Sequence, residues 1–442
     1  MSNRLFVKNT KQLSRTPERA VALALLEAGL TAIATKEVID RAITIERDHI
    51  VCTGCDNKKI MIAHESYKRL FVVAIGKCSI DASLSLERIF GKNIHKGIAV
   101  DVRDEPAGLH TIALRVGTHP YPSTQNIEYS KEIISLLEET NEDDLVLFII
   151  SGGASTLLCH PENHTCEDER VVVEELFKAG ATIQELNTVR KHLSLVRGGN
   201  LAKAAYPARS LSLIFSDVVG DELSCIASGP TLRDTTTKED AARIFEKYNL
   251  QEACNVAYVN LVDTPKEEKY FEKAEHLLVV SNTVLLRAMA ARAHELGYTA
   301  EICTHCLYGE ARDVGKAIAE RLHSTKPKHI LLFGGESTVT INGTGSGGRN
   351  QELALAALMH IRDGETILAC ATDGKDNSPV AGAIADTLAK DTAVHAGVSI
   401  AAMLEDNNSY TAYKQIGDYV DTGYTGSNTA DVVIAIKSHY GI

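Results

Sequence analysis

Several polar segments of this chain directly follow apolar runs, and their residue types suit the binding of phosphate. Ile75-Gly76-Lys77 ends one run with a lysine, and Ser151-Gly152-Gly153-Ala154-Ser155 ends another with two glycines and two hydroxyls. Glycines let backbone N–H groups approach a phosphate, and hydroxyls add donors. Taken alone, a solvated surface charge is the better explanation of Lys77, and a plain strand-to-helix turn explains the Ser151 segment about equally well. Their shared position carries more weight, because an open parallel sheet places its ligand crevice at the strand ends.

Two further segments place pairs of aspartates after apolar runs. Asp217 and Asp221 lie in Ser-Asp-Val-Val-Gly-Asp, and Asp373 and Asp376 lie in Thr-Asp-Gly-Lys-Asp-Asn. Mg²⁺ prefers one or two carboxylates together with substrate phosphates. Asp-Gly turns are common, so each pair alone is a weak signal. As strand-end carboxylates they are candidates for holding a metal or orienting a hydroxyl.

A compact basic segment stands out because the chain is acidic. The 442 residues include 46 Lys and Arg against 58 Asp and Glu, which gives a net charge of −12. Arg190, Lys191 and Arg197 precede Gly198-Gly199 and form a local supply of cations for an anionic substrate, or else a solvated helix face. The acidic balance argues against nucleic acid and membrane surfaces as partners. No segment approaches the roughly 20 apolar residues of a membrane span.

The cysteine and glycine patterns argue against a zinc site and a dinucleotide site. The ten cysteines are scattered, which favours reduced thiols and a cytoplasmic location. Cys52-x-x-Cys55 and Cys303-x-x-Cys306 are some 250 residues apart, so two unrelated thiol pairs are preferred to one zinc site. The segment 342–352 formally contains the dinucleotide pattern G-x-G-x-x-G. We discount it because the preceding strand is short and polar and the acidic residue expected about 20 positions later is missing.

Alternating strands and helices predict an α/β fold. Apolar, β-branched runs are separated by stretches with helical spacing of apolar residues, and Thr16-Pro17-Glu18 predicts the start of a further helix. The charged stretch Thr264–Glu275 is the expected domain junction, so we expect one domain over residues 1–265 and another over 275–442. The predicted strands are 70–75, 97–102, 111–116, 145–150, 211–215, 277–280, 299–303, 329–333 and 366–371, and the helices between them are 126–139, 165–180, 282–296, 311–323 and 351–360.

Taken together, these segments resemble the type II glycerate kinases, the glycerate 2-kinase family whose C-terminal half carries the MOFRL region. The similarity extends from about Leu70 to Ile436. The segments that carry it are Ile75-Gly76-Lys77, Gly117-Thr118-His119-Pro120 with Pro122, Ser151-Gly152-Gly153, Asn187 to Gly199, Ser216 to Asp221, Ile226 to Thr231, Gly334-Gly335-Glu336, Gly347 to Glu352, Thr372-Asp373-Gly374 and Thr422 to Asn428.

This resemblance implies two α/β domains, each with a mainly parallel sheet flanked by helices, and an active site in the cleft between them. It implies transfer of the γ-phosphoryl group of ATP to the 2-hydroxyl of D-glycerate. Lys77 and Arg349 match the proposed catalytic lysine and arginine of the family. The chain departs from the family pattern at Ala154, where a glycine is usual, and at Asn377, where Asp376 is usually followed by glycine.

The residues and the resemblance together yield a set of expected roles. A phosphoryl-transfer transition state requires mainly positioning and charge neutralisation, which cations, backbone amides and a metal supply. We expect ATP and Mg²⁺ or another divalent cation as cofactors, and a homodimer is a candidate assembly. The assignments are Lys77, Arg349 and Asp217 as catalytic; Ser151, Gly152, Gly153, Ser155, Gly347 and Gly348 as cofactor-binding; Arg190, Lys191, Arg197, Asn350 and Glu352 as substrate-binding; and Asp221 and Asp373 as metal ligands.

Two alternatives remain open at this stage. A hydroxypyruvate reductase would require a nicotinamide cofactor, and a non-catalytic sugar-acid-binding protein would bind glycerate without turning over a nucleotide. Both are distinguishable from a kinase by simple assays.

Overall fold

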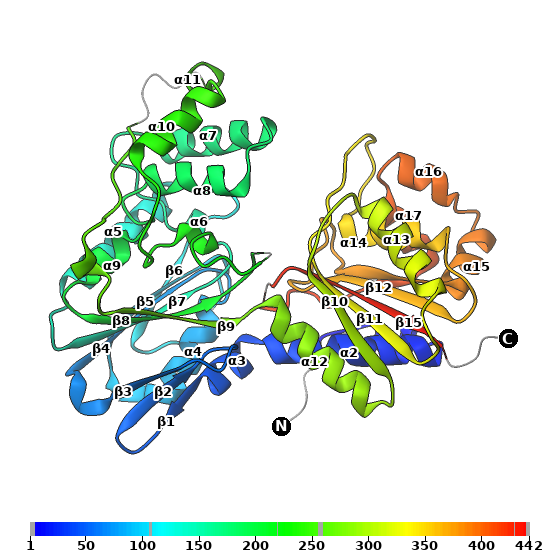
Figure 1. The fold of residues 1–442 in the computed structure, drawn as a ribbon, viewed down its shortest axis with the longest axis horizontal. Helices are drawn as coiled ribbons and strands as arrows, with labels where there is room; N and C mark the ends of the chain where they lie inside the picture. The colour runs from blue at the N-terminus through cyan, green and yellow to red at the C-terminus, as the bar shows by residue number, and fades with distance from the viewer. Residues whose placement is uncertain (1–4, 106–107, 219, 255–259, 428, 439–442) are drawn as a thin grey trace. The chain divides into compact units, whose positions relative to one another are not determined.

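The chain folds into two compact units (Figure 1). The computed structural model describes residues 5–105, 108–218, 220–254, 260–427 and 429–438. The central unit comprises Val38–Val280, and the split unit combines Met1–Glu37 with Ser281–Ile442. The expected division gave residues 1–265 to one domain and 275–442 to the other. In the structure the first 37 residues instead pack with the C-terminal part of the chain, and the later boundary falls between residues 280 and 281.

Helix α2 (Pro17–Ile33) shows why the N-terminal segment belongs to the split unit. It begins as predicted, with Pro17 at the first helical position and the Thr16 side chain accepting a hydrogen bond from the backbone N–H of Arg19. The Arg19 side chain is fully buried and donates to Asp386 and Asp418 over 2.6–2.9 Å. A buried guanidinium needs such partners, so these ion pairs fix α2 to the C-terminal residues.

A parallel sheet of six strands forms the core of the central unit, in the order β6-β5-β4-β7-β8-β9. Helix α4 (Ser79–Phe90) covers one face, and α5 (Thr124–Glu138) and α9 (Asn200–Ala205) cover the other (Figure 1). Every residue of β7 is buried, as expected for a central strand covered on both faces. The strands are β4 (Arg69–Ile75), β5 (Ile94–Asp101), β6 (Ile112–Val116), β7 (Asp144–Ile150), β8 (Arg209–Phe215) and β9 (Ala274–Val280).

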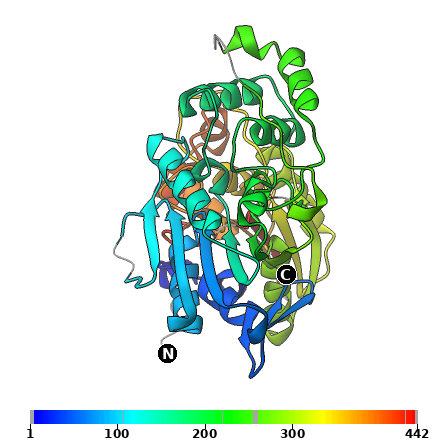
Figure 2. The same cartoon turned by 90° about the vertical axis from the view of Figure 1, so that its left-hand side faces the viewer.

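A small helical layer with its own apolar core completes one end of the central unit (Figures 1 and 2). Capping boxes at Thr165 and Thr182 start α7 (Cys166–Lys178) and α8 (Ile183–His192). Leu176 and Leu186 are among the residues that α7 and α8 bury against α10 (Lys238–Lys247) and α11 (Leu250–Ala253).

A separate antiparallel sheet in the central unit was not predicted. It contains β1 (Ile43–Ile45), β2 (His49–Thr53) and β3 (Lys59–Ala63), drawn in blue in Figure 2. The burial of β3 alternates along its first four residues, so a period-2 signal was present in the sequence.

The sheet of the split unit is mixed, which corrects the expectation of two mainly parallel sheets. Its order is β10-β11-β15-β12-β13-β14, and only the β10–β11 pair is parallel. The last strand of the chain inserts antiparallel between β11 and β12, and its pattern was not recognised in the sequence. The strands are β10 (Thr299–Leu307), β11 (His329–Gly335), β12 (Glu365–Ala371), β13 (Gly382–Asp386), β14 (Tyr419–Val420) and β15 (Asp431–Lys437).

Helices cover both faces of this mixed sheet (Figure 1). Helices α2 and α12 (Asn282–Glu295) contact each other and pack on one face. The other face and its core are covered by α13 (Ala311–His323), α14 (Arg349–Leu358), α15 (Thr387–His395), α16 (Ile400–Glu405) and α17 (Ser409–Ile416). The nine predicted strands and five predicted helices are confirmed, with ends shifted by a few residues.

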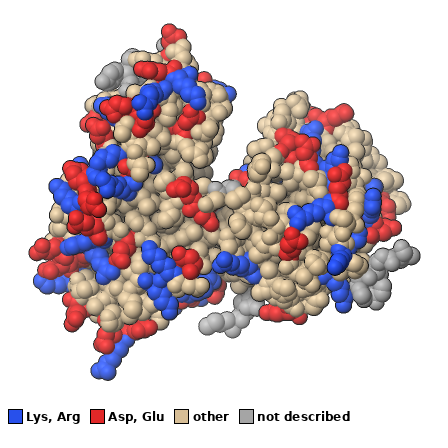
Figure 3. Space-filling model, in the orientation of Figure 1, with Lys and Arg blue, Asp and Glu red and all other residues tan. Residues whose placement is uncertain are grey.

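Acidic and basic side chains are interspersed on the face shown in Figure 3, over both units. None of the helices in the described part of the chain combines the length and apolar character that a membrane crossing requires.

Candidate functional site

Three adjacent strands of the central sheet, β4, β7 and β8, end in the polar loops singled out in the sequence. Lys77 donates its backbone N–H to the carbonyl of Gly152 over 2.9 Å. The Ser151 hydroxyl accepts from the backbone N–H of Cys78 at 3.3 Å. The loops after β4 and β7 are therefore bonded directly to each other, with Lys77 at the junction.

Glycine is required where these loops meet. A Cβ at position 152 would overlap the carboxylate of Asp217, which follows β8. Gly153 has a φ of +85°, and a Cβ there would lie 3.3 Å from Cγ of Lys77 and 3.4 Å from Cδ2 of His119. The structure thus gathers Lys77, His119 and Asp217 around the two glycines.

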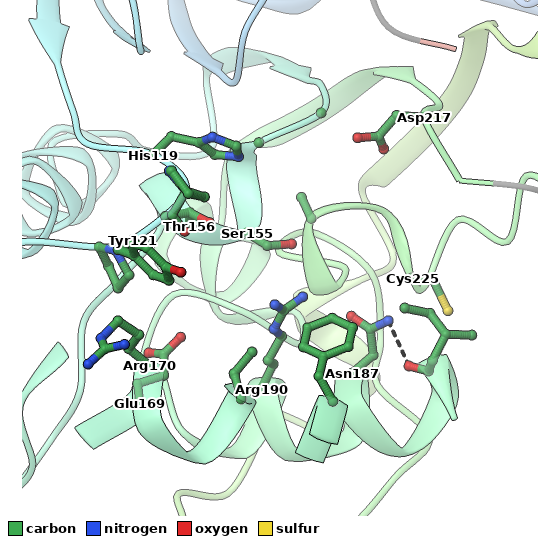
Figure 4. A pocket seen from close by; sticks show the side chains of 18 of the residues that line it. His119, Tyr121, Ser155, Thr156, Glu169, Arg170, Asn187, Arg190, Asp217 and Cys225 are labelled. Carbon is green, nitrogen blue, oxygen red and sulfur yellow. Dashed lines mark hydrogen bonds between the residues drawn. The ribbon is translucent and has the colours of Figure 1, made fainter. Parts of the chain in front are cut away.

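A cavity of about 450 Å³ opens beside this loop cluster (Figure 4). Its polar wall includes the strand-end loops, and α7 and α8 supply the opposite wall. Of the predicted site residues it contains Gly152, Gly153, Ser155, Arg190 and Asp217. The remaining lining residues are His119, Pro120, Tyr121, Pro122, Thr156, Glu169, Arg170, Val173, Glu174, Phe177, Ile183, Asn187, Val218, Cys225 and Ala227.

The three predicted substrate-binding cations of this unit have different environments. Arg197 is buried, pairs with Glu169 at 2.6 Å and donates to the carbonyl of Ser155 at 2.6 Å. Lys191 is directed away from the cavity and pairs with Asp234 at 3.1 Å. Each of these two charges is already neutralised by a carboxylate.

Arg190 differs from both neighbours. Its side chain extends from α8 into the cavity (Figure 4). The described residues provide its guanidinium with neither a hydrogen bond nor an ion pair. Burial, with the nearby charge of Arg197, lowers the pKa of Arg190 to about 10, so it remains cationic at neutral pH. An anionic ligand would supply the missing partner.

His119 contributes a neutral imidazole to the cavity. Burial, together with the positive charge of Lys77, lowers its pKa to about 4. At neutral pH its ring can therefore accept a hydrogen bond from a substrate hydroxyl.

Asp221 does not reach this cavity. It lies beyond Asp217 with a φ of +55°, and its backbone N–H donates to the carbonyl of Val218 at 3.1 Å. Val219, in the same predicted segment, and Asn428, in another, lie outside the described residues.

Arg349 begins helix α14 of the split unit. Its guanidinium forms ion pairs with Asp431 and, at 2.9 Å, with Glu336. Burial alone would lower the pKa of Arg349, but the hydrogen bonds and charge of Asp431 raise it above its ordinary value. The side chain is 34% exposed, so part of it can still meet a ligand.

The next residues of α14 serve the structure of the helix. Asn350 donates through its backbone and side chain to Asp376, at 3.0 and 3.1 Å, and Gln351 does so at 2.8 Å through each. Glu352 pairs with Arg312 at 2.6 Å and lies 3.3 Å from the side-chain nitrogen of Asn407. Asp376 therefore caps α14, and the side chains of Asn350 and Glu352 are already engaged.

The glycine-rich segment before α14 is a packing loop. A Cβ on Gly343 or Gly345 would overlap the backbone of Asp406, and one on Gly348 would overlap that of Asp376. At Gly347, where φ is +155°, it would overlap the Ser409 hydroxyl. Because β11 ends at Gly335, well before α14 begins, this loop does not form the strand-turn-helix unit of a dinucleotide site.

Asp373 lies in the loop after β12 and is partly exposed. Its carboxylate accepts the backbone N–H of Lys375 at 2.9 Å, and its carbonyl accepts that of Thr425 at 3.3 Å. The two Cys-x-x-Cys pairs belong to different units, and all ten cysteines are free.

Several lining residues were absent from the predicted site. The segment Gly117–Pro122 follows β6, so its strand-end position could have identified His119 and Tyr121. Glu169 and Phe177 lie on α7, where the helical pattern alone gave no signal for a ligand.

Comparison with known proteins identifies relatives of the whole chain. Residues 21–262 match a family model described as a domain of unknown function (DUF4147), and residues 329–431 match the MOFRL family. A glycerate 2-kinase of Pyrococcus horikoshii is 36% identical, with 95% of this chain and 97% of the relative aligned. A protein of Agrobacterium vitis, provisionally named hydroxypyruvate reductase, is 38% identical over 82% of this chain and 86% of its own length.

The fold also has a counterpart among solved structures. The crystal structure of a glycerate kinase from Thermotoga maritima superposes with a TM-score of 0.82 at 32% identity, covering 95% of this chain and 99% of that chain. With both family models matched and near-complete alignment to a named member, this chain belongs to the glycerate 2-kinase family.

Proposed function

We propose that this protein is an ATP-dependent kinase that transfers the γ-phosphoryl group to the 2-hydroxyl of D-glycerate and releases 2-phosphoglycerate. The family supports this function. The observation that carries it locally is the cavity of the central unit. There Lys77 borders two glycines, and Arg190 extends a cation for which the described residues provide no partner.

These groups suit phosphoryl transfer. The reaction needs its substrates aligned and the charge on the transferring oxygens neutralised. Lys77 and Arg349 provide positive charge, and Ser151, Gly152, Gly153 and Ser155 provide backbone and hydroxyl donors. Gly347 and Gly348 remain proposed nucleotide contacts through their backbone. Asp217 and neutral His119 are the groups that we propose orient the substrate hydroxyl.

A divalent cation is part of the proposal. Among the described residues no group of three or more His, Cys, Asp or Glu side chains could hold a metal ion. Asp217 nevertheless lines the cavity, and a single carboxylate combined with nucleotide phosphates fits the preference of Mg²⁺. The ion would neutralise phosphate charge when it is bound. Asp373 is the corresponding candidate in the split unit.

The reaction product can be identified with a coupled assay. With D-glycerate, Mg-ATP and enolase, but no phosphoglycerate mutase, we expect phosphoenolpyruvate, because enolase accepts only the 2-phosphate. Signal that requires added mutase would identify the 3-phosphate and refute the proposed site of transfer.

The same protein preparation tests the reductase alternative. Oxidation of NADH with hydroxypyruvate, in the absence of ATP, would support a reductase. We expect none, because the glycine-rich segment 342–352 packs against α16 and α17 and lacks the preceding strand that a nicotinamide site needs.

A further inference from the structure

The cavity of the central unit has one apolar end. Val173 and Phe177 of α7 and Ile183 at the start of α8 line it. Phe177 is 60% exposed and Ile183 is 46% exposed. An exposed phenylalanine beside a cavity is a feature that a ligand can cover.

The opposite end of the cavity is charged. Glu169, near the start of α7, is neutralised by Arg197, and Arg170 by Glu167 and Glu174. Arg190, near the end of α8, has no such partner among the described residues. The charged end therefore offers an anion one unneutralised cation.

The spacing of residues along α7 and α8 explains why one end of the cavity is apolar and the other is charged. Ile183, Asn187 and Arg190 are spaced four and three residues apart, which places them on one face of α8. At about 1.5 Å per residue, Ile183 and Arg190 are about 10 Å apart along the helix. Since α7 and α8 are joined by a short turn, the end of α7 that carries Phe177 is adjacent to Ile183.

We propose that this cavity is the nucleotide site, with the base against Phe177 and Ile183 and the phosphates passing Arg190 toward Gly152 and Gly153. This inference rests on the proposed kinase function. Of the two substrates, glycerate has no apolar surface to cover an exposed phenylalanine, whereas the base of ATP does. The charged end then receives the phosphates, and Arg197 supports their loop through its bond to Ser155.

The inference assigns Arg190 to the nucleotide rather than to the carboxylate of the acid. It also assigns the base and the phosphates of the nucleotide to different ends of the cavity, so that their contributions to affinity can be measured separately. The base is bound by stacking on the aromatic ring, and the phosphates are bound by the charge of Arg190.

The test compares two probes, ADP and inorganic tripolyphosphate, which has phosphates but no base. Titration calorimetry would measure both with Phe177→Ser and with Arg190→Met. Phe177→Ser should weaken ADP binding about tenfold and leave tripolyphosphate binding unchanged. Arg190→Met should weaken both. Tyr308→Ser, which changes an aromatic side chain that is 82% exposed in the split unit, is the matched control and should change neither.

Two results would overturn the inference. One is unchanged ADP affinity in Phe177→Ser with a normal melting temperature. The other is a raised KM for D-glycerate in Arg190→Met with unchanged ADP affinity, which would return Arg190 to the acid. If the wild-type protein binds ADP with these variant effects but does not phosphorylate D-glycerate, the proposed acceptor fails and the nucleotide site stands.

Discussion

Arg190, Lys191 and Arg197 are close in sequence but do not share a task, and their differences arise from their surroundings. Two of them face buried carboxylates, Asp234 and Glu169, at 3.1 and 2.6 Å. For the third, Arg190, the described residues supply no carboxylate within ion-pair distance. Removing a paired, buried cation leaves a charged group without a partner, whereas removing Arg190 removes a potential ligand contact.

The first prediction contrasts two of these cations. Lys191→Met should lower stability by about 1–3 kcal/mol, because it takes one of the cations from buried Asp234. Arg190→Met should cost far less stability while weakening nucleotide binding. Urea unfolding monitored by circular dichroism measures both. Equal losses of stability in the two variants would contradict this division of roles.

The second prediction concerns Lys77. Lys77→Met should lower kcat about 100-fold or more, because it removes a charge interaction with the transferring group. Lys92→Met, at an exposed position, is the control. Near-normal turnover in Lys77→Met, with unchanged melting temperature, would exclude a catalytic role for this lysine.

Whether Arg349 has a catalytic role must be tested with a conservative variant. Its ion pair with buried Asp431 means that Arg349→Leu would also strand a carboxylate. Arg349→Lys keeps the charge but loses the planar two-nitrogen contact. We expect Arg349→Lys to lower kcat while leaving the melting temperature nearly unchanged. A lower melting temperature with an unchanged kcat would assign Arg349 a structural role only.

The third prediction tests the proposed metal carboxylate. Asp217→Asn should raise the Mg²⁺ concentration needed for half-maximal rate, because it weakens the protein's share of the coordination. Activity measured against free Mg²⁺ in a buffered series gives the shift. Full activity of the wild type after exhaustive chelation would remove the metal from the mechanism.

At the scale of elements, helix α14 depends on a residue from a distant loop. Asp376 accepts four hydrogen bonds from Asn350 and Gln351, two of them from the backbone at the first turn. A carboxylate at a helix N-terminus satisfies donors that the helix itself cannot and is favoured by the helix dipole.

This contact gives the fourth prediction. Asp376→Ala should destabilise the split unit by about 2–4 kcal/mol, since it leaves several buried donors unpaired. Asp373→Ala, three residues earlier and partly exposed, is the matched control for stability. Comparable melting temperatures for the two variants would show that the cap is unimportant.

The elements also show which parts of the fold the sequence could reveal. Buried parallel strands such as β4 and β7 are continuous apolar runs, and they were located within a residue or two. Strand direction in the split unit was not readable, because β15 pairs with strands about 65 to 100 positions earlier and only the assembled sheet defines that pairing. The strand-end loops could be located because each directly follows one of these apolar runs. The wall from α7 was not, because ligand-facing and solvent-facing helix residues look alike in sequence.

At the scale of the whole molecule, buried neutral histidines link stability to pH. Burial, with the charge of Lys58, lowers the pKa of His276 to about 4, although its bond to Thr231 opposes the shift. His119 shifts in the same direction. In the unfolded chain these groups take up protons near pH 6.5, so the unfolded state binds more protons between about pH 6.5 and 4. Stability from this source is therefore lost as the pH falls through that range.

The fifth prediction follows from this linkage. Wild-type protein should lose stability between pH 7 and 4.5, and His276→Gln should reduce that loss, by at most about 3 kcal/mol. Urea unfolding at several pH values measures it, with exposed His110→Gln as the control. An identical pH dependence in wild type and His276→Gln would contradict the contribution of His276.

The split unit imposes an order on folding during synthesis. The central unit is one continuous stretch, so it can close as soon as residue 280 has left the ribosome. Helix α2 is synthesised before the central unit, but the carboxylates that neutralise Arg19 lie at positions 386 and 418, beyond that unit. Its apolar face and the Arg19 guanidinium therefore lack their native partners while more than three hundred residues are translated. A helix that is synthesised before the central unit thus reaches its native contacts after that unit can fold, and during this interval its apolar face is open to aggregation.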